Sequence, residues 1–288
     1  MPPRIRAGSL VAVVAPASPF DRQELFRGLS WLRLRYRLRI SPGIFARDGY
    51  LAGDDARRAG ELSAAMTDPS VEAIVCARGG YGAMRILDAL PWDAFVARPK
   101  WIAGFSDVTA LHVAAGARGV ATVHAPNVTG LGRSITPAER DAFIAALESG
   151  ASRTWRGLVP IRPGSARGPI AGGNLALVAA MAAGRRLVVP EGAILVLEDV
   201  TERPYRIDRM LTSLLMGGHL ARAGAIVFGG FTQCDPGPDG VTVEHVLRDR
   251  TASLRIPVVM GAPFGHGAPN HAFVLGGEGV LDGDELRL

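Results

Sequence analysis

Short apolar runs alternate with longer stretches of helical spacing along the first half of the chain. The first run, residues 10–15, is valine-rich and ends at Pro16, which is typical of a buried parallel strand. Strands that alternate with helices at this spacing indicate βαβ units and a mostly parallel sheet, whose functional loops follow the carboxyl ends of the strands. The same pattern predicts strands at 38–41, 71–77 and 101–104 and helices over 21–36, 54–66, 83–90 and 108–116.

The segment 149–168 separates two regions, because it is rich in glycine, serine, arginine and proline. We expect it to be a linker between one domain at 1–148 and a second at 169–288. The second region begins with a glycine turn and a helix at 172–183. It continues with an apolar strand at 193–197 that ends in Glu198 and Asp199, a charged helix at 205–215, a strand at 225–228 and a glycine-rich tail of short strands.

The composition is that of an ordinary globular protein, with 48% hydrophobic and 6% aromatic residues. The apolar run at 10–15 is too short for a signal sequence or a membrane span, so we expect a cytoplasmic protein with no membrane partner. Cys76 and Cys234 lie far apart and form no C-x-x-C pair, which disfavours a disulfide or a zinc site and favours core thiols.

A net charge of +5 raises the question of nucleic-acid binding. Lys100 is the only lysine, and the arginines are scattered among acidic residues instead of forming a stripe. Because a nucleic-acid surface needs clustered positive charge, no nucleic-acid partner is expected.

Ser106 lies immediately after the predicted strand at 101–104 and at the mouth of the next helix. A hydroxyl on such a turn, beside the N–H groups of a helix start, suits a nucleophile. It also suits an ordinary N-cap, and Val108 stands where a G-x-S-x-G motif needs its second glycine. The loop Gly-Gly-Tyr-Gly at 79–82 could offer backbone N–H groups to an oxyanion or a phosphate, although Arg85 breaks the G-x-G-x-x-G pattern.

Glu198 and His266 are the other candidates for chemistry. Glu198 ends an apolar strand, where its carboxylate could orient a histidine and stabilise an imidazolium. The alternative for Glu198 is an ion pair with Arg203 or Arg206. His266 stands between two glycines on a tightly turned backbone, from which its ring could reach a neighbour; the alternative is a solvent-facing loop histidine.

Together these segments closely resemble the LD-carboxypeptidases, also called muramoyltetrapeptide carboxypeptidases. The likeness runs almost end to end and includes the order Ser106, Glu198, His266. The matching segments are V-A-V-V-A-P-A-S-P at 11–19, C-A-R-G-G-Y-G-A at 76–83, G-F-S-D-V-T-A-L-H at 104–112, A-G-G-N-L-A-L at 171–177, L-E-D-V-T-E-R-P-Y-R-I-D-R-M-L at 197–211, F-G-G-F-T-Q-C-D at 228–235 and P-F-G-H-G-A-P-N at 263–270.

The resemblance implies an α/β fold with two domains. A Rossmann-like, mostly parallel N-terminal domain would carry Ser106, and a smaller mixed α/β domain would carry Glu198 and His266. In this scheme the serine attacks the scissile carbonyl, the histidine transfers the proton and the glutamate fixes the histidine tautomer. The backbone N–H groups of Gly80 and Asp107 are the expected oxyanion hole.

The family's usual reaction removes the terminal D-alanine from a murein tetrapeptide during cell-wall recycling. The resemblance therefore implies a small muropeptide as substrate, with neither a metal nor an organic cofactor, and relatives suggest a homodimer. A terminal carboxylate suits a bidentate arginine, for which Arg78 and Arg206 are the candidates, although each could instead be a structural ion-pair partner.

Three other functions are compatible with parts of the pattern. A branch of the same family cleaves microcin-type peptidyl nucleotides for self-immunity and stacks an aromatic of an extended loop on the base; here the linker is short, and Trp155 is its only aromatic. An α/β-hydrolase esterase shares the chain order of the triad but needs a second elbow glycine and an H-G-G-G motif. A non-catalytic nucleotide-binding protein would need a dinucleotide fingerprint or a P-loop, and the sequence has neither.

Overall fold

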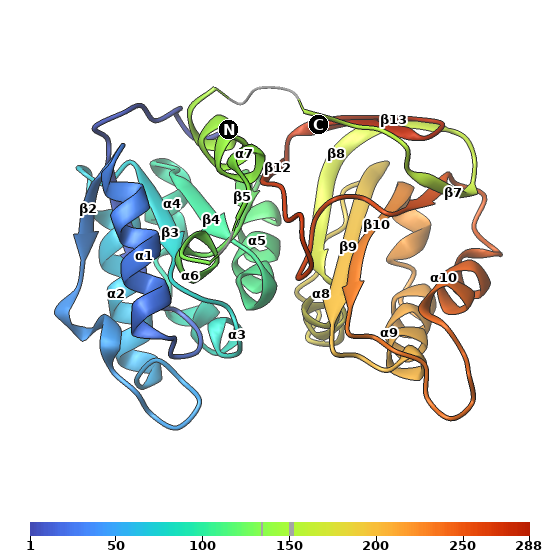
Figure 1. The fold of residues 1–288 in the computed structure, drawn as a ribbon, viewed down its shortest axis with the longest axis horizontal. Helices are drawn as coiled ribbons and strands as arrows, with labels where there is room; N and C mark the ends of the chain where they lie inside the picture. The colour runs from blue at the N-terminus through green and yellow to red at the C-terminus, as the bar shows by residue number, and fades with distance from the viewer. Residues whose placement is uncertain (134, 150–152) are drawn as a thin grey trace. The chain divides into compact units, whose positions relative to one another are not determined.

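Two sheets, each with its own core, divide the chain into two units (Figure 1). The computed structural model describes residues 1–133, 135–149 and 153–288. The first unit comprises Met1–Ala151 together with His271–Val274, and the second comprises Ser152–Asn270 together with Leu275–Leu288. Within the described ranges, no helix combines the length and the apolar character needed to cross a membrane.

The sheet of the first unit has six strands in the order β12-β5-β4-β3-β1-β2. The pairs formed among β1 to β5 are all parallel, which confirms the predicted mostly parallel sheet. β3 and β4 are buried along their whole length, as is typical of parallel strands with both faces covered. The strands are β1 Leu10–Val14, β2 Arg37–Ile40, β3 Ala73–Cys76, β4 Trp101–Gly104, β5 Thr122–His124 and β12 Phe273–Leu275.

The first two helices begin where the sequence supplies a capping aspartate. Asp21 accepts a hydrogen bond from the N–H of Glu24 at 2.8 Å, and Asp54 accepts one from the N–H of Arg57 at 2.7 Å. The helix predicted at 83–90 is split, because a 3₁₀ turn follows its first four residues. The helices are α1 Arg22–Arg33, α2 Asp55–Thr67, α3 Ala83–Ile86, α4 Trp92–Ala97, α5 Thr109–Gly116, α6 Val128–Leu131 and α7 Pro137–Glu148, with 3₁₀ turns η1 Pro42–Phe45, η2 Leu87–Ala89 and η3 Ser106–Val108.

The second unit has a mixed sheet of eight strands in the order β6-β14-β13-β8-β9-β10-β11-β7. The four strands β8 to β11 are parallel, and the outer strands join them through antiparallel pairs, which agrees with a mixed α/β unit. Leu195 and Leu197 of β9 share one buried cluster with Leu211 of α9 and Val246 of α10. The elements are β6 Thr154–Trp155, β7 Val159–Arg162, β8 Ser165–Asn174, α8 Leu175–Ala183, β9 Ala193–Val200, α9 Pro204–Met216, η4 Leu220–Arg222, β10 Ala223–Thr232, α10 Val243–Thr251, β11 Val258–Met260, β13 Glu278–Asp282 and β14 Glu285–Arg287.

The segment 149–168 is not a linker over its described part. From Thr154 onward it supplies β6, β7 and the start of β8, all of which belong to the sheet of the second unit. Pro160 is compatible with a strand because β7, which contains it, lies at the edge of the sheet, and Pro163 lies between β7 and β8. At an edge, a residue without an N–H removes no interior ladder bond.

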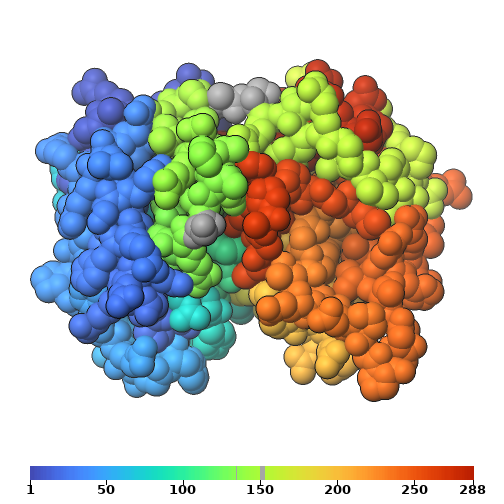
Figure 2. Space-filling model, in the orientation of Figure 1, coloured from blue at the N-terminus to red at the C-terminus, as the bar shows by residue number. Residues whose placement is uncertain are grey.

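Two further features of the C-terminal part differ from the prediction. The tail contains α10, which starts where Thr242 accepts a hydrogen bond from the N–H of His245 at 3.1 Å, so it is not made of strands alone. His271–Val274 belongs to the first unit, because β12 extends that sheet beside β5. In the space-filling view this orange-red segment lies against green residues of the first unit (Figure 2). The two cysteines are buried free thiols, as predicted.

Candidate active site

Ser106 occupies a strained turn between β4 and α5. Its φ is +65°, in the left-handed region, and the preceding Phe105 is extended. A non-glycine residue in that region costs on the order of 1–3 kcal/mol, and such residues concentrate at functional sites. The N-cap interpretation is wrong, since η3 begins after Phe105 and α5 after Val108, with no side-chain cap bond at either start. The turn instead has the strand–turn–helix form of a nucleophile elbow.

Gly79 brings the glycine loop directly against this turn. A Cβ atom at Gly79 would lie 2.7 Å from the Cβ and 3.0 Å from the Oγ of Ser106, and 3.2 Å from the backbone N of Asp107. Gly80 has a φ of +103°, and a Cβ there would lie 2.4 Å from the Oγ of Ser18. Only glycine at both positions permits this approach, so the loop 79–82 and the elbow form one structure.

Two buried charged side chains hold the far end of the glycine loop. The Arg58 guanidinium, which is fully buried, donates to the Gly82 carbonyl at 2.8 Å, and the Asp107 carboxylate accepts from the Ala83 N–H at 2.7 Å. Burial raises the pKa of Asp107 to about 6, against the opposing effects of the Ala83 N–H and of Arg58. The Gly82–Ala83 peptide group is therefore held from both sides, and one of its two partners, Asp107, directly follows Ser106 in the chain.

The second unit brings Glu198 and His266 together. Glu198 lies in β9 with no exposed surface, and its Oε2 is 2.7 Å from Nδ1 of His266. Gly265 has a φ of +125°, and its N–H donates to Oδ1 of Asn270 at 3.1 Å, so the backbone before the histidine is fixed. His266 is only 18% exposed, and the interpretation as a solvent-facing loop histidine is wrong.

The alternative ion pairs for Glu198 are also wrong. Arg206 lies 3.5 Å from Oε2 of Glu202 and donates to the Tyr205 hydroxyl at 3.2 Å. Arg203 donates instead to the backbone carbonyls of Asp235 and Pro236. Neither arginine therefore neutralises the Glu198 carboxylate.

Asn174 is a residue of this site that the sequence reasoning missed. Its Oδ1 caps α8 by accepting from the Leu177 N–H at 3.2 Å. Its Nδ2 lies 3.4 Å from Oε1 of Glu198 and donates to Oδ1 of Asp199 at 2.9 Å. The motif A-G-G-N-L-A-L signalled a helix start, but only the pairing of β8 with β9 places Asn174 opposite Glu198.

Asp199 follows Glu198 but serves a different purpose. Its carboxylate accepts from the N–H groups of Ala176 at 2.9 Å and Val200 at 2.8 Å. Burial raises the pKa of Asp199 to about 6, while these hydrogen bonds and the Asn174 amide oppose the shift. Asp199 thus ties the start of α8 to β9.

The two candidate substrate arginines lie in different settings. Arg78 belongs to the first unit, donates to the Pro19 carbonyl, and lines a cavity of about 750 Å³ with residues 19–22 and 44–47. Arg206 belongs to the second unit, where Glu202 and Tyr205 already contact it.

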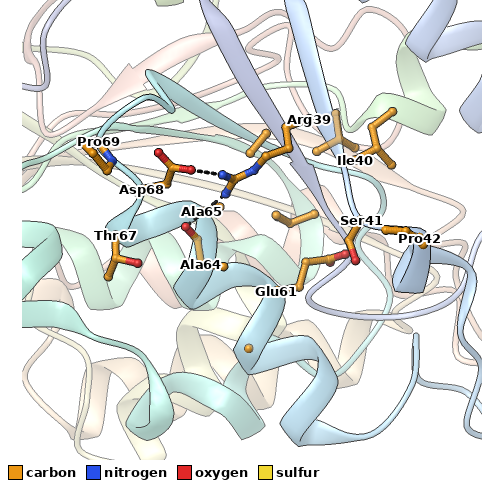
Figure 3. Close-up of a pocket in the computed structure, with 14 residues that line it drawn as sticks. Arg39, Ile40, Ser41, Pro42, Glu61, Ala64, Ala65, Thr67, Asp68 and Pro69 are labelled. Carbon is orange, nitrogen blue, oxygen red and sulfur yellow. Dashed lines mark hydrogen bonds and ion pairs between the residues drawn. The ribbon is translucent and has the colours of Figure 1, made fainter.

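A second cavity in the first unit, of about 840 Å³, lies between β2 and α2 (Figure 3). The ion pair of Arg39 with Asp68 stands at its side, and Glu61 lines it from α2. None of the residues predicted to carry chemistry lines this cavity. Across the described ranges, no group of three or more histidine, cysteine, aspartate or glutamate side chains is placed to hold a metal ion.

Two family models match the chain in succession. Residues 11–125 match the N-terminal domain and residues 167–281 match the C-terminal domain of LD-carboxypeptidase. A putative carboxypeptidase of Streptomyces coelicolor is 42% identical over 92% of this chain and 87% of its own length. The murein tetrapeptide carboxypeptidase of Pseudomonas aeruginosa is 35% identical, with 96% of this chain and 94% of that protein covered.

Solved structures show the same fold. The crystal structure of muramoyltetrapeptide carboxypeptidase from Oxalobacter formigenes superposes with a TM-score of 0.88 at 27% identity, covering 97% of each chain. The microcin C7 self-immunity protein of Escherichia coli is a more distant relative, 25% identical over 95% of this chain and 90% of its own length.

Proposed function

The chain belongs to the LD-carboxypeptidase family, and from this premise we propose that it releases the terminal D-alanine from murein tetrapeptides. It is an enzyme, a serine-type carboxypeptidase of the hydrolase class. The observation that carries the proposal is the 2.7 Å contact between Nδ1 of His266 and the buried Glu198 carboxylate. A buried carboxylate on one ring nitrogen prepares the other nitrogen to act as a base.

The proposed mechanism uses Ser106, His266 and Glu198 as a triad. With its Nδ1 proton donated to Glu198, the neutral His266 ring carries its lone pair on Nε2, which takes the proton as Ser106 Oγ attacks the scissile carbonyl. His266 then gives that proton to the nitrogen of D-alanine as the peptide bond breaks. His266 Nε2 then takes a proton from water as the water oxygen attacks the acyl-enzyme carbonyl, and it returns this proton to Ser106 Oγ as the ester bond breaks.

The backbone N–H groups of Gly80 and Asp107 are the proposed oxyanion hole. In support, the glycine loop approaches the elbow so closely that a Cβ at Gly79 would lie 3.2 Å from the Asp107 nitrogen. Donors on this rigid backbone need no reorganisation when charge develops on the carbonyl oxygen. Loss of one such donor lowers turnover by about 10²- to 10³-fold.

Arg78 and Arg206 are the candidates for binding substrate carboxylates. A guanidinium binds a carboxylate through two parallel hydrogen bonds, and Arg78 faces a cavity while making one bond to the protein, to Pro19. KM for the tetrapeptide should rise in Arg78→Ala and in Arg206→Ala. Unchanged KM in both variants would remove these arginines from the proposal.

The peptidyl-nucleotide alternative has less support than murein peptides. It requires an accessible aromatic to stack on a base, whereas Trp155 in β6 is 4% exposed and stacks on Phe264 with ring centroids 5.7 Å apart. Membership of a peptidase family also argues against a non-catalytic nucleotide-binding protein.

The test is mass-spectrometric detection of D-alanine released from L-Ala-γ-D-Glu-meso-diaminopimelyl-D-Ala by wild type and by Ser106→Ala. Release by wild type alone would support both the substrate class and the nucleophile. Release that persists in Ser106→Ala would exclude Ser106, and absence of release by either would turn the test to peptidyl-nucleotide conjugates. We also propose a cytoplasmic homodimer, which cell fractionation and analytical ultracentrifugation would check.

A further inference from the structure

The cavity that Arg78 lines lies at the carboxyl ends of three neighbouring parallel strands. Residues 19–22 follow β1, residues 44–47 follow β2, and Arg78 follows β3. In open α/β sheets ligands bind at this edge. The cavity, of about 750 Å³, is therefore in the position where the fold places ligands.

Three arginines, Arg22, Arg47 and Arg78, line this cavity, which we call the arginine cavity. None of the three forms an ion pair with any residue that the structure describes. The Arg22 guanidinium lies over the Phe45 ring, 4.9 Å from its centroid, and Arg78 donates to the Pro19 carbonyl. All three arginines are exposed and none is bound to a carboxylate of the described residues, so they are available to an anionic ligand.

The acidic residue of the lining does not compensate this charge. Asp21 uses Oδ1 to cap α1, where it accepts from the Glu24 N–H at 2.8 Å. Arg22, as the first residue of α1, adds a cation at the helix end that already carries partial positive charge. The arginine cavity thus has three cations against one anion, an arrangement suited to an anionic ligand.

Strand spacing shows which part of a substrate reaches this cavity. Ser106 follows β4, and the cavity spans the ends of β3, β1 and β2, the next three strands in the sheet. Neighbouring strands are about 4.8 Å apart, so the lining lies about 5–15 Å from the strand of the nucleophile. From bond lengths, the carboxylate of the terminal D-alanine lies only about 4 Å from the scissile carbonyl of diaminopimelate.

Two carboxylates on the acyl side of a murein tetrapeptide lie further away. The α-carboxylate of γ-linked D-glutamate and the distal carboxylate of diaminopimelate are about 7–9 Å from the scissile carbonyl by the same bond lengths. This distance falls within the span of the arginine cavity, whereas the terminal carboxylate lies short of most of it. We propose that the arginine cavity binds a carboxylate on the acyl side of the substrate, through Arg22, Arg47 and Arg78. The inference rests on the proposed function and leaves Arg206 as the candidate for the terminal carboxylate.

The experiment compares three tetrapeptides: the free acid, the α-amide of γ-D-glutamate and the distal monoamide of diaminopimelate. For wild type, kcat/KM should fall about 10- to 100-fold for one of the two amides, because a charge-assisted contact is lost. Arg47→Gln should show the same fall with the free acid and little further loss with that amide. Arg4→Gln, an exposed arginine of the same unit outside the lining, is the control and should behave as wild type. Whichever amide gives the effect identifies the carboxylate.

A binding measurement separates failure of this inference from failure of the proposed function. Isothermal titration calorimetry measures the affinity for the dipeptide L-Ala-γ-D-Glu and for diaminopimelate, and it requires no catalytic turnover. If one of them binds wild type and binds Arg47→Gln about 10-fold more weakly, the cavity is an anion subsite even when no D-alanine is released. Equal kcat/KM for all three tetrapeptides, or equal effects of Arg47→Gln and Arg4→Gln in both measurements, would overturn the inference.

Discussion

Replacing Gly79 by alanine tests whether the glycine loop positions Ser106, the proposed nucleophile. The added Cβ would lie 2.7 Å from the Cβ of Ser106, whereas ordinary contacts begin at 3.4 Å. The two segments must therefore separate by about 0.7 Å, and misplacement of reacting groups by about 1 Å costs on the order of 10²-fold in rate. We expect kcat/KM for D-alanine release to fall about 10- to 100-fold in Gly79→Ala.

The assay has two parts and a matched control. The rate at which a fluorophosphonate labels Ser106 reports the elbow without a murein substrate, and D-alanine release reports the full reaction. Gly60→Ala is the control, because Gly60 lies inside α2 and a Cβ there meets nothing within 4 Å. It should keep both rates and stabilise the fold by about 0.5–1 kcal/mol. Wild-type labelling and turnover in Gly79→Ala would refute the positioning argument.

Three other predictions follow from the buried polar groups. Glu198→Gln should lower kcat by about 10⁴-fold with the fold retained, because the amide no longer selects the Nδ1-protonated tautomer of His266. Steady-state kinetics measures kcat, circular dichroism checks the fold, and a near-normal kcat would exclude the triad. Asn174→Ala should lower the free energy of unfolding, measured by urea titration, by about 2–4 kcal/mol, because it loses the cap of α8 and a hydrogen bond to the Asp199 carboxylate. Asn174→Ser keeps the cap, so its free energy of unfolding should fall by less. Because burial raises the pKa of Asp107 from 3.8 to about 6, its favourable contribution is complete well below pH 3.8 and is lost as the pH rises through 6. The stability difference between Asp107→Asn and wild type should therefore shift in favour of the variant by about 3 kcal/mol between pH 3 and 7, and a constant difference would contradict the burial argument.

Local patterns explain why much of this protein was predictable. Valine-rich runs closed by proline or glycine mark the parallel strands, and capping residues such as Asp21 and Asp54 mark helix starts, because both depend on neighbours along the chain. For the same reason the strand-to-helix setting of Ser106 and the glycines around His266 could be recognised before any contact was known. The predicted site residues therefore lie where their local sequence indicates a turn or a strand end.

Edge strands and buried partners could not be predicted in this way. A proline-rich segment can be a linker or an edge strand, and only the position of β7 beside β11 decides between them. Likewise Trp155 looked available for stacking, but the sheet buries it against Phe264. In both cases the deciding neighbour lies far away in the sequence.

Local periodicity and short motifs were sufficient to predict the parallel core strands, the family and the residue types offered for chemistry, but not α10 or the strands within 149–168. Which charged and polar groups meet depends on contacts between distant parts of the chain. The tertiary structure pairs Glu198 with His266 and Asn174 instead of an arginine, holds the glycine loop with Arg58 and Asp107, and gathers three arginines at one edge of a sheet. Glu198, Arg58 and Asp107 are buried, and a buried charge is stable only beside a partner, which strand pairing and packing bring from a distant part of the chain. The three arginines stay exposed, and only the order of the parallel strands places them side by side.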